Sequence, residues 1–255
     1  MSFVNKVAIV TGASSGIGRA AALKLAESGA SVVGVGRDRA ALEDSIADMK
    51  HAGAAAIAVV TDVTAAMAPD EIVNLAVTRF GGVDVLVNAA GIIGFGATDA
   101  TTDEEWDRMM NTNARAPFRL MRAAFPHLKA RKGSVVNVSS VNGRRVFPGL
   151  SAYNTSKGAL DHLTRCAAID WAPHGVRVNA VNPGVTVTNL HRRAGLDEEK
   201  YAAFLARSKE THPLGRPGQV GDVAALIVFL ASDDAEFITG ETVAVDGGRH
   251  LTCAR

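Results

Sequence analysis

The sequence has little cysteine and no long hydrophobic run. Its two cysteines, Cys166 and Cys253, provide no disulfide framework and no zinc-ligand spacing, so we expect no metal site. His162 lies four residues before Cys166, and with no second pair nearby we predict that both side chains pack in the core. The longest apolar run, Val223 to Ala231, is about half of the ~20 residues that a membrane-spanning helix needs.

An excess of charge of either sign is also lacking. Lys and Arg number 27 and Asp and Glu number 26, which predicts neither a nucleic-acid binder nor a membrane binder. No signal-peptide pattern precedes the first apolar segment, so we expect a soluble, cytoplasmic protein. Hydrophobic residues at 47% and charged residues at 21% exclude a disordered chain, and aromatic residues at 5% predict a mostly aliphatic core.

Short β-branched runs alternate along the chain with longer Ala- and Leu-rich stretches of helical period. This pattern is typical of a parallel sheet covered by helices on both faces. We predict strands at 7–11, 31–36, 56–60, 83–87, 134–138, 177–181 and 242–245, and helices at 17–28, 39–52, 69–80, 103–128, 152–171 and 219–231. Without repeats or linkers, residues 1–255 are predicted to form a single doubly wound α/β domain of the Rossmann type.

Residues 185–218 interrupt this alternation. The segment contains Arg192 and Arg193, then a polar helix near 198–209, and it ends in Pro213, Gly215, Pro217 and Gly218. It is too long for an ordinary connection, and it follows the C-terminal end of a strand, where open α/β sheets place their ligands. It is therefore either a lid over a substrate or a surface insertion.

A glycine-rich turn joins the first strand to the first helix. It reads Thr11-Gly12-Ala13-Ser14-Ser15-Gly16-Ile17-Gly18. Glycines let the backbone approach a pyrophosphate, and the helix N-terminus adds N–H donors and a positive dipole end. The spacing differs from the common G-x-G-x-x-G fingerprint, but between a strand and a helix it predicts nucleotide binding rather than turn geometry alone.

Two more motifs follow predicted strands. The small residues of Asn88-Ala89-Ala90-Gly91 would let a flat cofactor lie against the backbone, although such a segment is equally typical of a turn. Ser140 ends the fifth strand, and Tyr153 and Lys157 then lie four residues apart on one helix face. A nearby cation favours the phenolate of Tyr153, whose ordinary pKa of about 10 would make it a poor acid–base catalyst.

Over essentially its whole length, the chain resembles the classical short-chain dehydrogenases/reductases. The resemblance is carried by the glycine-rich turn, Asp62-Val63, Asn88–Gly91, Asn113, Ser140, Tyr153, Lys157, Pro183-Gly184, Thr188 and Asp246-Gly247-Gly248. It implies a seven-stranded parallel sheet of order 3-2-1-4-5-6-7. One departure is Ala89, where the family often has a second Asn.

The resemblance also implies roles for these residues. Tyr153 would be the catalytic acid/base, Lys157 would lower its pKa and hold the nicotinamide ribose, and Ser140 would position the substrate oxygen. The other implied cofactor contacts are the turn residues Gly12, Ser14, Ser15, Gly16, Ile17 and Gly18, then Asp62 and Val63 at the adenine, Asn88, Ala89, Ala90 and Gly91 at the adjacent ribose, and Pro183, Gly184, Thr186 and Thr188 at the nicotinamide.

A proline four residues after Asn113 gives a second, independent reason to expect a role for this residue. Pro117 lies four residues later and has no N–H, so the helical bond to the carbonyl of Asn113 cannot form. If residues 103–128 are one helix, we expect a kink there and a free carbonyl near Lys157 that can hold a water. That water would extend a proton path from Tyr153 to solvent. The alternative is a kink without a chemical role.

The end of the second strand, Gly36-Arg37-Asp38, bears on the choice of cofactor. A carboxylate here usually binds the 2′-hydroxyl of NAD, whereas an arginine accommodates the 2′-phosphate of NADP. In the family that the chain resembles, the discriminating acid usually occupies the position of Gly36. Arg37 can pair with a phosphate through two hydrogen bonds, and Asp38 suits the N-cap of the next helix. We expect NADP(H), with NAD(H) as the alternative if Asp38 binds the ribose.

The motifs of this chain are compatible with three classes of function. The favoured one is a nicotinamide-dependent oxidoreductase acting on a carbonyl or alcohol; the others are a non-catalytic dinucleotide-binding regulator and a lyase or dehalogenase variant. The intact set of Asn113, Ser140, Tyr153 and Lys157 argues against the regulator. The intact glycine-rich turn and Lys157 argue against the variant, in which one of them is usually replaced.

Within the favoured class, the runner-up is a 3-oxoacyl-(acyl-carrier-protein) reductase, because two basic clusters could contact an acidic carrier protein. They are Lys129, Arg131 and Lys132, which also suit a helix C-terminus, and Arg192 with Arg193. The resemblance further implies a homotetramer. Apolar and small residues around much of the helix at 152–171 give it modest support; they are Ala159, Leu160, Leu163, Ala167 and Ala168.

Overall fold

Seven parallel strands form one sheet in the computed structural model, which describes residues 1–252. Their order is β3-β2-β1-β4-β5-β6-β7, as the resemblance implied. The strands are β1 (Val7–Thr11), β2 (Ser31–Gly36), β3 (Ala56–Val60), β4 (Val85–Asn88), β5 (Ser134–Val138), β6 (Arg177–Pro183) and β7 (Thr242–Val245). The order reverses between β1 and β4, which is where doubly wound sheets open a crevice at the carboxyl ends of their strands.

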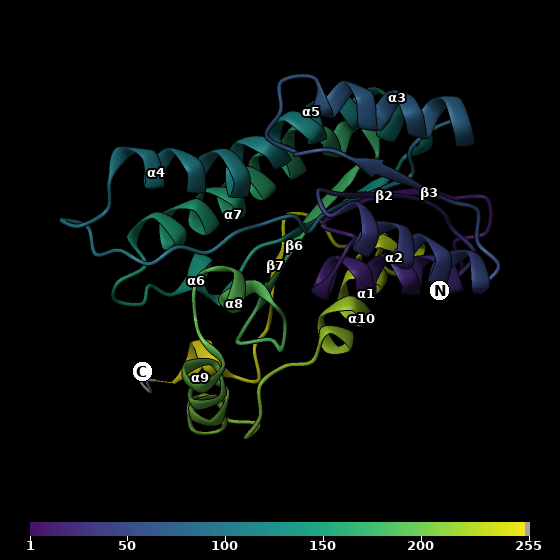
Figure 1. The fold of residues 1–255 in the computed structure, drawn as a ribbon. Helices are drawn as coiled ribbons and strands as arrows, with labels where there is room; N and C mark the ends of the chain where they lie inside the picture. Colours follow the sequence, from purple (N-terminus) through teal and green to yellow (C-terminus); the bar gives the residue numbers. More distant parts are fainter. Residues whose placement is uncertain (253–255) are drawn as a thin grey trace.

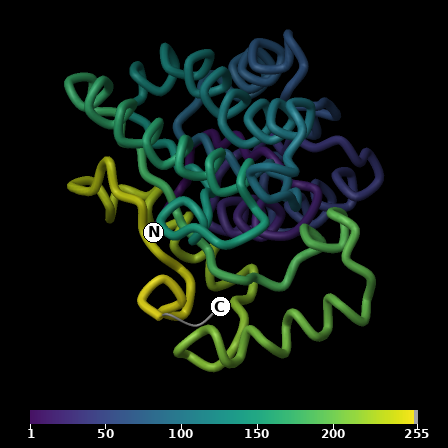
Figure 2. Tube along the Cα trace, turned by 90° about the vertical axis from the view of Figure 1, so that its left-hand side faces the viewer, coloured from purple at the N-terminus to yellow at the C-terminus, as the bar shows by residue number. Residues whose placement is uncertain are grey.

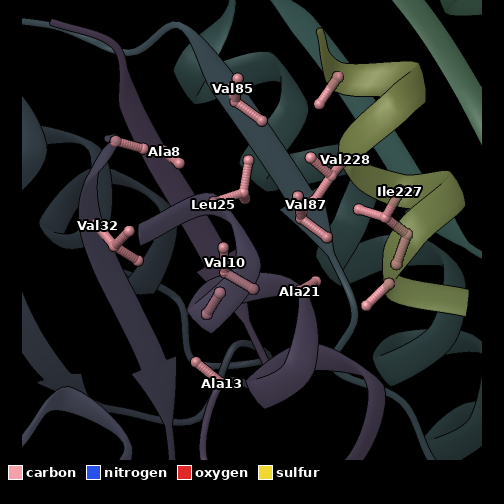
Figure 3. Close-up of a cluster of buried hydrophobic side chains, with 14 of the residues drawn as sticks. Ala8, Val10, Ala13, Ala21, Leu25, Val32, Val85, Val87, Ile227 and Val228 are labelled. Atoms are coloured by element: carbon pink, nitrogen blue, oxygen red, sulfur yellow. The ribbon is translucent and has the colours of Figure 1, made fainter. Parts of the chain in front are cut away.

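Helices cover both faces of this sheet (Figure 1). The helices on one face are α1 (Gly16–Glu27), α2 (Arg39–His51) and α10 (Val220–Ala231), and those on the other are α3 (Ala68–Phe80), α5 (Ala116–Arg131) and α7 (Ser151–Trp171). The first face buries Val10 and Val87 of the sheet against Leu25 and Ile227 (Figure 3). Each face thus has its own aliphatic core, and the strands between them are apolar on both sides.

The region predicted as one helix at 103–128 has three parts. These are α4 (Asp103–Met110), a π-helical turn at Asn111–Arg115, and α5. The backbone N–H of Ala116 bonds to the carbonyl of Asn111, five residues earlier. The predicted departure from α-geometry is therefore present, just before Pro117, and it takes the form of a π-turn. Such turns are frequent at functional sites.

Two sequence-based expectations are wrong in detail. β4 begins at Val85 instead of Val83, and the Asp84 carboxylate just before it accepts the backbone N–H of Val7 at the start of β1. His162 and Cys166 are exposed on α7 instead of packing in the core. No element among residues 1–252 covers this face of α7, where Ile169 is 77% exposed.

Residues 185–218 carry two further helices. α8 (Leu190–Arg193) and α9 (Glu198–Thr211) project from the layered body beside the C-terminal part of the chain, as Figures 1 and 2 both show. The N–H of Leu214 donates to the carbonyl of Gly247, which links the two segments. None of the helices in the described part of the chain is long and apolar enough to cross a membrane.

Candidate active site

The glycine-rich turn is shaped by positions that admit no side chain. Gly12 and Gly16 have φ values of 69° and 58°, in the left-handed region that favours glycine. A Cβ atom on Gly18 would lie 2.3 Å from the carbonyl oxygen of Gly12. Ser15 occupies the N-cap position of α1 with extended backbone geometry, and its side chain makes no capping hydrogen bond. The turn thus brings bare backbone and a helix N-terminus to one edge of the sheet, as a pyrophosphate site requires.

The loop after β4 packs directly on this turn. The hydroxyl of Thr11 accepts the backbone N–H groups of Ala89 and Ala90, both at 3.0 Å. The side chain of Asn88 points elsewhere: its amide donates to Oδ1 of Asn137 at 2.8 Å and joins β4 to β5. The structure therefore brings the backbone of residues 89–91 to the cavity, while the Asn88 side chain has a structural partner.

Tyr153 and Lys157 are buried on the first turns of α7, beside Ser140. Ser140 is the N-cap of the short helix α6 (Val141–Arg144), and its hydroxyl accepts the N–H of Asn142 at 3.1 Å. The Nζ of Lys157 lies 5.8 Å from the centroid of the Tyr153 ring and donates to the carbonyl of Val138 at 2.9 Å. The three predicted catalytic side chains therefore meet at the carboxyl end of β5.

Burial dominates the electrostatics of this group. It raises the pKa of Tyr153, and a hydrogen bond with Ser140 opposes that rise. Burial lowers the pKa of Lys157 to about 8, and the carboxylate of Asp161 acts in the opposite direction. Tyr153 is thus a neutral phenol, a proton donor, beside an amine whose pKa is about 8. The lowering of the Tyr153 pKa by Lys157 that the resemblance implied is not seen in the protein by itself.

Asn113 is held at this site by its side chain. Its Oδ1 accepts the N–H of Ile92 at 3.0 Å, and its amide donates to the carbonyl of Ile92 and to the hydroxyl of Ser156, at 2.9 and 3.0 Å. A Cβ atom on Gly91 would lie 3.3 Å from Oδ1 of Asn113 and 3.5 Å from Nζ of Lys157. The side chain of Asn113 and the Nζ of Lys157 therefore both approach Gly91. The predicted proton path depends instead on the backbone carbonyl of Asn113, and it stays a prediction.

One cavity of about 340 Å³ joins these elements. It runs past the glycine-rich turn, the loop after β4, the catalytic group and the start of the segment 185–218. Among the predicted residues it is lined by Gly12, Ser14, Ser15, Gly16, Ile17, Gly18, Arg37, Asp62, Val63, Ala89, Ala90, Gly91, Ser140, Tyr153, Lys157, Pro183, Gly184, Thr186 and Thr188. Asn88 and Asn113 are buried and are not among the residues that line it.

The adenine end of the cavity contains a charged pair. Arg37 is exposed at the end of β2, and its Nη1 lies 3.5 Å from Oδ2 of Asp62. Asp62 also accepts the N–H and hydroxyl of Thr64; these bonds and Arg37 outweigh burial and lower its pKa. Asp38 accepts the N–H of Ala41 at 3.1 Å, so it is the N-cap of α2 as predicted. At Gly36, a Cβ atom would lie 3.2 Å from the Ser14 side chain.

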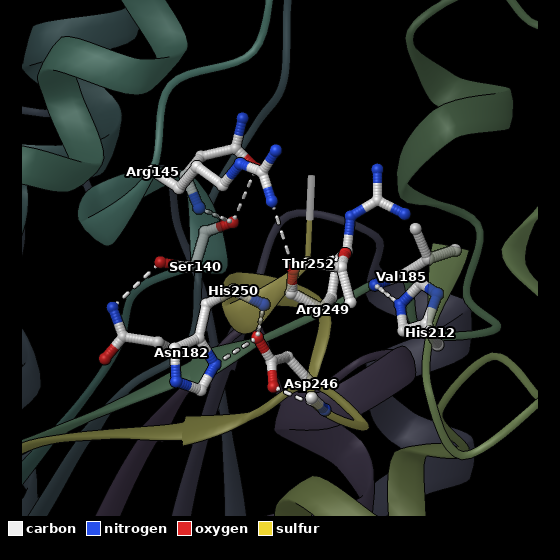
Figure 4. Close-up of polar contacts among 11 residues, drawn as sticks. Ser140, Arg145, Asn182, Val185, His212, Asp246, Arg249, His250 and Thr252 are labelled. Carbon is white, nitrogen blue, oxygen red and sulfur yellow. Dashed lines mark hydrogen bonds and ion pairs between the residues drawn. The ribbon is translucent and has the colours of Figure 1, made fainter. Parts of the chain in front are cut away.

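A histidine that no sequence pattern indicates holds the start of residues 185–218 in place. His212 is buried, its Nδ1 lies 2.8 Å from the carbonyl of Ser208, and its Nε2 accepts the N–H of Val185 at 3.2 Å. Figure 4 shows this ring against the start of the segment. A Cβ atom on Gly184 would lie 2.8 Å from the same Nε2. A histidine next to Pro213 has no distinctive local pattern, so only the fold reveals the contact.

The known proteins that this chain resembles are dehydrogenases and reductases. A family profile described as enoyl-(acyl carrier protein) reductase matches residues 12–250. The human protein "Dehydrogenase/reductase SDR family member 4" is 40% identical over 246 residues, which is 96% of this chain and 87% of that protein. A 3-oxoacyl-(acyl-carrier-protein) reductase of Staphylococcus epidermidis is 36% identical over 250 residues, covering 97% of this chain and 100% of the relative.

Solved structures agree in fold. A short-chain dehydrogenase/reductase of unknown function from Caenorhabditis elegans, solved with cofactor, superposes with a TM-score of 0.91. It is 36% identical, and the match covers 98% of this chain and 97% of that one. A short-chain type dehydrogenase/reductase from Mycobacterium marinum has a TM-score of 0.90 at 32% identity, with 99% and 97% covered.

Proposed function

Because the chain belongs to the short-chain dehydrogenase/reductase family and is thus an NAD(P)-dependent oxidoreductase, we propose that it interconverts a carbonyl compound and a secondary alcohol, using NADP(H). The observation that carries the proposal is the meeting of Ser140, Tyr153 and Lys157 in the cavity that the glycine-rich turn also lines. A non-catalytic dinucleotide-binding protein would need the turn but not the buried phenol and amine.

The residues present fit a dinucleotide. Side chains at Gly12 or Gly18 would collide with backbone, so the turn stays open to a pyrophosphate. The walls formed by residues 89–91 and by Pro183 and Gly184 would hold the ribose and nicotinamide parts. Bound nicotinamide supplies the hydride, or accepts it in the reverse direction.

The chain's own residues manage the proton. In the reducing direction, the neutral phenol of Tyr153 donates its proton to the substrate oxygen, which the hydroxyl of Ser140 holds. Lys157 then favours the phenolate that remains, since a cation beside a phenol stabilises its charged form. A water on the backbone carbonyl of Asn113, to which Pro117 cannot donate an N–H, would extend the proton path from Lys157 to solvent.

The preference for NADP(H) is supported by Arg37. Its guanidinium is exposed at the end of β2, and Asp38, the acid that could bind a ribose hydroxyl instead, is engaged in capping α2. Gly36 presents no carboxylate to repel a phosphate. The segment 185–218 would act as the lid, because its α8 lines the cavity through Leu190, His191 and Arg193.

The carrier-protein alternative receives less support from the geometry. Arg192 is paired with Glu198 through two hydrogen bonds of 2.6 and 2.9 Å, and Arg131 lies 3.5 Å from Asp84. These guanidiniums are therefore already neutralised within the chain. A small-molecule substrate fits the site better. The assembly we propose is a homotetramer in the cytoplasm, with exposed Phe118 and Ile169 as candidate contacts, and light scattering tests it.

The direct test is oxidation of NADPH and of NADH with a panel of ketones, aldehydes and acyl thioesters. Tyr153→Phe keeps the ring and removes the oxygen that carries the proton. We expect turnover to fall at least 100-fold in this variant, in the range of general acid–base contributions, while cofactor binding persists. A Tyr153→Phe variant with nearly wild-type turnover would refute the assignment.

A further inference from the structure

Two arginines share one aromatic ring beside the active-site cavity. Phe147 and Arg249 both line that cavity, and the ζ carbon of Arg249 lies 4.8 Å from the Phe147 ring centroid. The ζ carbon of Arg145 lies 5.4 Å from the same centroid. Arg145 also donates to the carbonyl oxygen of Arg249 at 3.3 Å (Figure 4), although the two are 104 residues apart. Phe147 thus fixes two cations at one place in the substrate region.

This pair has no carboxylate counter-ion within residues 1–252: neither Arg145 nor Arg249 forms an ion pair there. Partial burial lowers the pKa of Arg249, and the cations of Arg145 and Arg207 lower it further. Asp246 is the one acid that opposes this effect, and both its oxygens already accept N–H groups from the turn that follows. The positive charge here is therefore incompletely neutralised.

Arg249 also has N–H groups that donate to no other described residue. A guanidinium has five N–H groups. Among the contacts of the described residues, Arg249 commits one of these groups, to the hydroxyl of Thr211. A partly buried cation with uncommitted donors, next to a catalytic cavity, matches an oxyanion, whose two oxygens can accept two parallel N–H groups.

We propose that Arg249, supported by Arg145, binds a carboxylate or phosphate group on the substrate, with Phe147 packed against the neighbouring carbon atoms. This inference rests on the proposed reductase function and restricts it to acidic carbonyl compounds and alcohols. The two oxyanions share the chemistry that a guanidinium recognises, and the experiment separates them.

The first test compares acetoacetate with its uncharged methyl ester as substrates. Arg249→Met keeps an unbranched side chain over Phe147 and removes the charge. We expect this variant to lower the acid-to-ester ratio of kcat/KM by about 10- to 100-fold, the range for losing hydrogen bonds to a charged group. Arg249→Lys should retain part of the preference. Arg79→Met, on the exposed end of α3, is the matched control and should leave the ratio unchanged.

The second test needs no turnover. Calorimetry measures the binding of malonate and of inorganic phosphate to the wild-type protein with NADP⁺. We expect at least tenfold weaker binding to Arg249→Met, and the tighter of the two anions identifies the acidic group. If the protein reduces no carbonyl compound but binds malonate or phosphate through Arg249, the reductase proposal fails and the anion site stands.

The anion site is refuted if Arg249→Met leaves both the acid-to-ester ratio and anion binding unchanged. Weak binding that is equal in wild type and variant refutes it as well. If Arg249→Met does not fold, Arg145→Met and Arg249→Lys take its place, and the same ratios decide between the outcomes.

Discussion

The side-chain amide of Asn182 donates to Oδ2 of Asp161 at 2.9 Å, yet Oδ1 of Asp161 and Oδ1 of Asn182 have no donor. Both side chains are buried, and the same amide donates to the carbonyl of Ser140 at 2.8 Å, which fixes its orientation. Burial raises the pKa of Asp161, against the lowering effects of its hydrogen bonds and of nearby cations. Oδ1 of Asn182 lacks a donor, and a proton on Asp161 is one that this buried pair could supply.

We therefore predict that Asp161→Asn is tolerated, because an amide can donate to Asn182 where a protonated carboxyl would. Asp161→Leu should cost about 1–3 kcal/mol, since it leaves polar groups of Asn182 unpaired in the interior. A raised pKa in the folded state stabilises the wild type below the unfolded pKa of about 3.9, and this contribution is lost as the pH rises through the folded value.

Urea unfolding between pH 4 and pH 8 measures this effect. The stability of the wild type relative to Asp161→Asn should fall as the pH rises. Infrared spectra with isotope-labelled aspartate should show a protonated-carboxyl band that the variant lacks. A pH-independent stability difference and no such band would mean that Asp161 is ionised.

For Lys157 we predict the opposite pH dependence of folding stability. Burial lowers its pKa from 10.5 to about 8, so the folded protein binds fewer protons than the unfolded chain between these values. The lowered pKa of Lys157 therefore contributes fully to the free energy of unfolding above pH 10.5, and this contribution is lost as the pH falls to 8. Relative to Lys157→Met, the cofactor-free wild type should therefore gain on the order of 3 kcal/mol across that range. Unfolding curves at both ends measure it, and parallel pH profiles would contradict it.

Arg37 should decide between the two cofactors. Arg37→Ala removes the guanidinium expected at the 2′-phosphate, so we predict that KM for NADPH rises about tenfold or more while KM for NADH changes little. Arg39→Ala is the control, because Arg39 is exposed in the same region and pairs with Glu43. Steady-state kinetics with both cofactors provide the measurement. A wild-type enzyme with higher kcat/KM for NADH would overturn the NADP(H) assignment.

Substitution of Gly18 tests whether the backbone of the glycine-rich turn contacts the cofactor. A Cβ atom there would lie 2.3 Å from a carbonyl oxygen, so Gly18→Ala must displace the backbone and should weaken cofactor binding at least tenfold. Gly221→Ala is the matched control: this helix position has open space around it and should become slightly more stable. Cofactor titration by fluorescence compares the two variants. Equal affinity would show that the turn does not contact the dinucleotide.

The parts of this site that the sequence predicts are local in the chain. The glycine-rich turn, the Tyr153–Lys157 pair and the N-cap role of Asp38 each depend on spacing within one turn or helix, and the structure places them as expected. The fold class follows from the alternation of apolar runs, and the strand order from the family resemblance.

The parts that the sequence does not predict depend on distant contacts. Arg249 reaches the catalytic region because the C-terminal segment returns to Phe147, and His212 meets Val185 across 27 residues. The exposure of Cys166 also cannot be read from the sequence, because an apolar helix pattern does not tell which face another element covers. The sequence around Arg249 and around His212 contains no pattern that indicates these long-range contacts.

The side chain of Asn113 imitates a peptide group. It accepts the N–H of Ile92 and donates to the carbonyl of the same residue, the double contact that a neighbouring strand would make. Ile92 lies in a segment with no regular secondary structure. Its amide hydrogen should therefore exchange with deuterated water as slowly as one inside a sheet, and this part of the loop after β4 would be as rigid as a strand without being one.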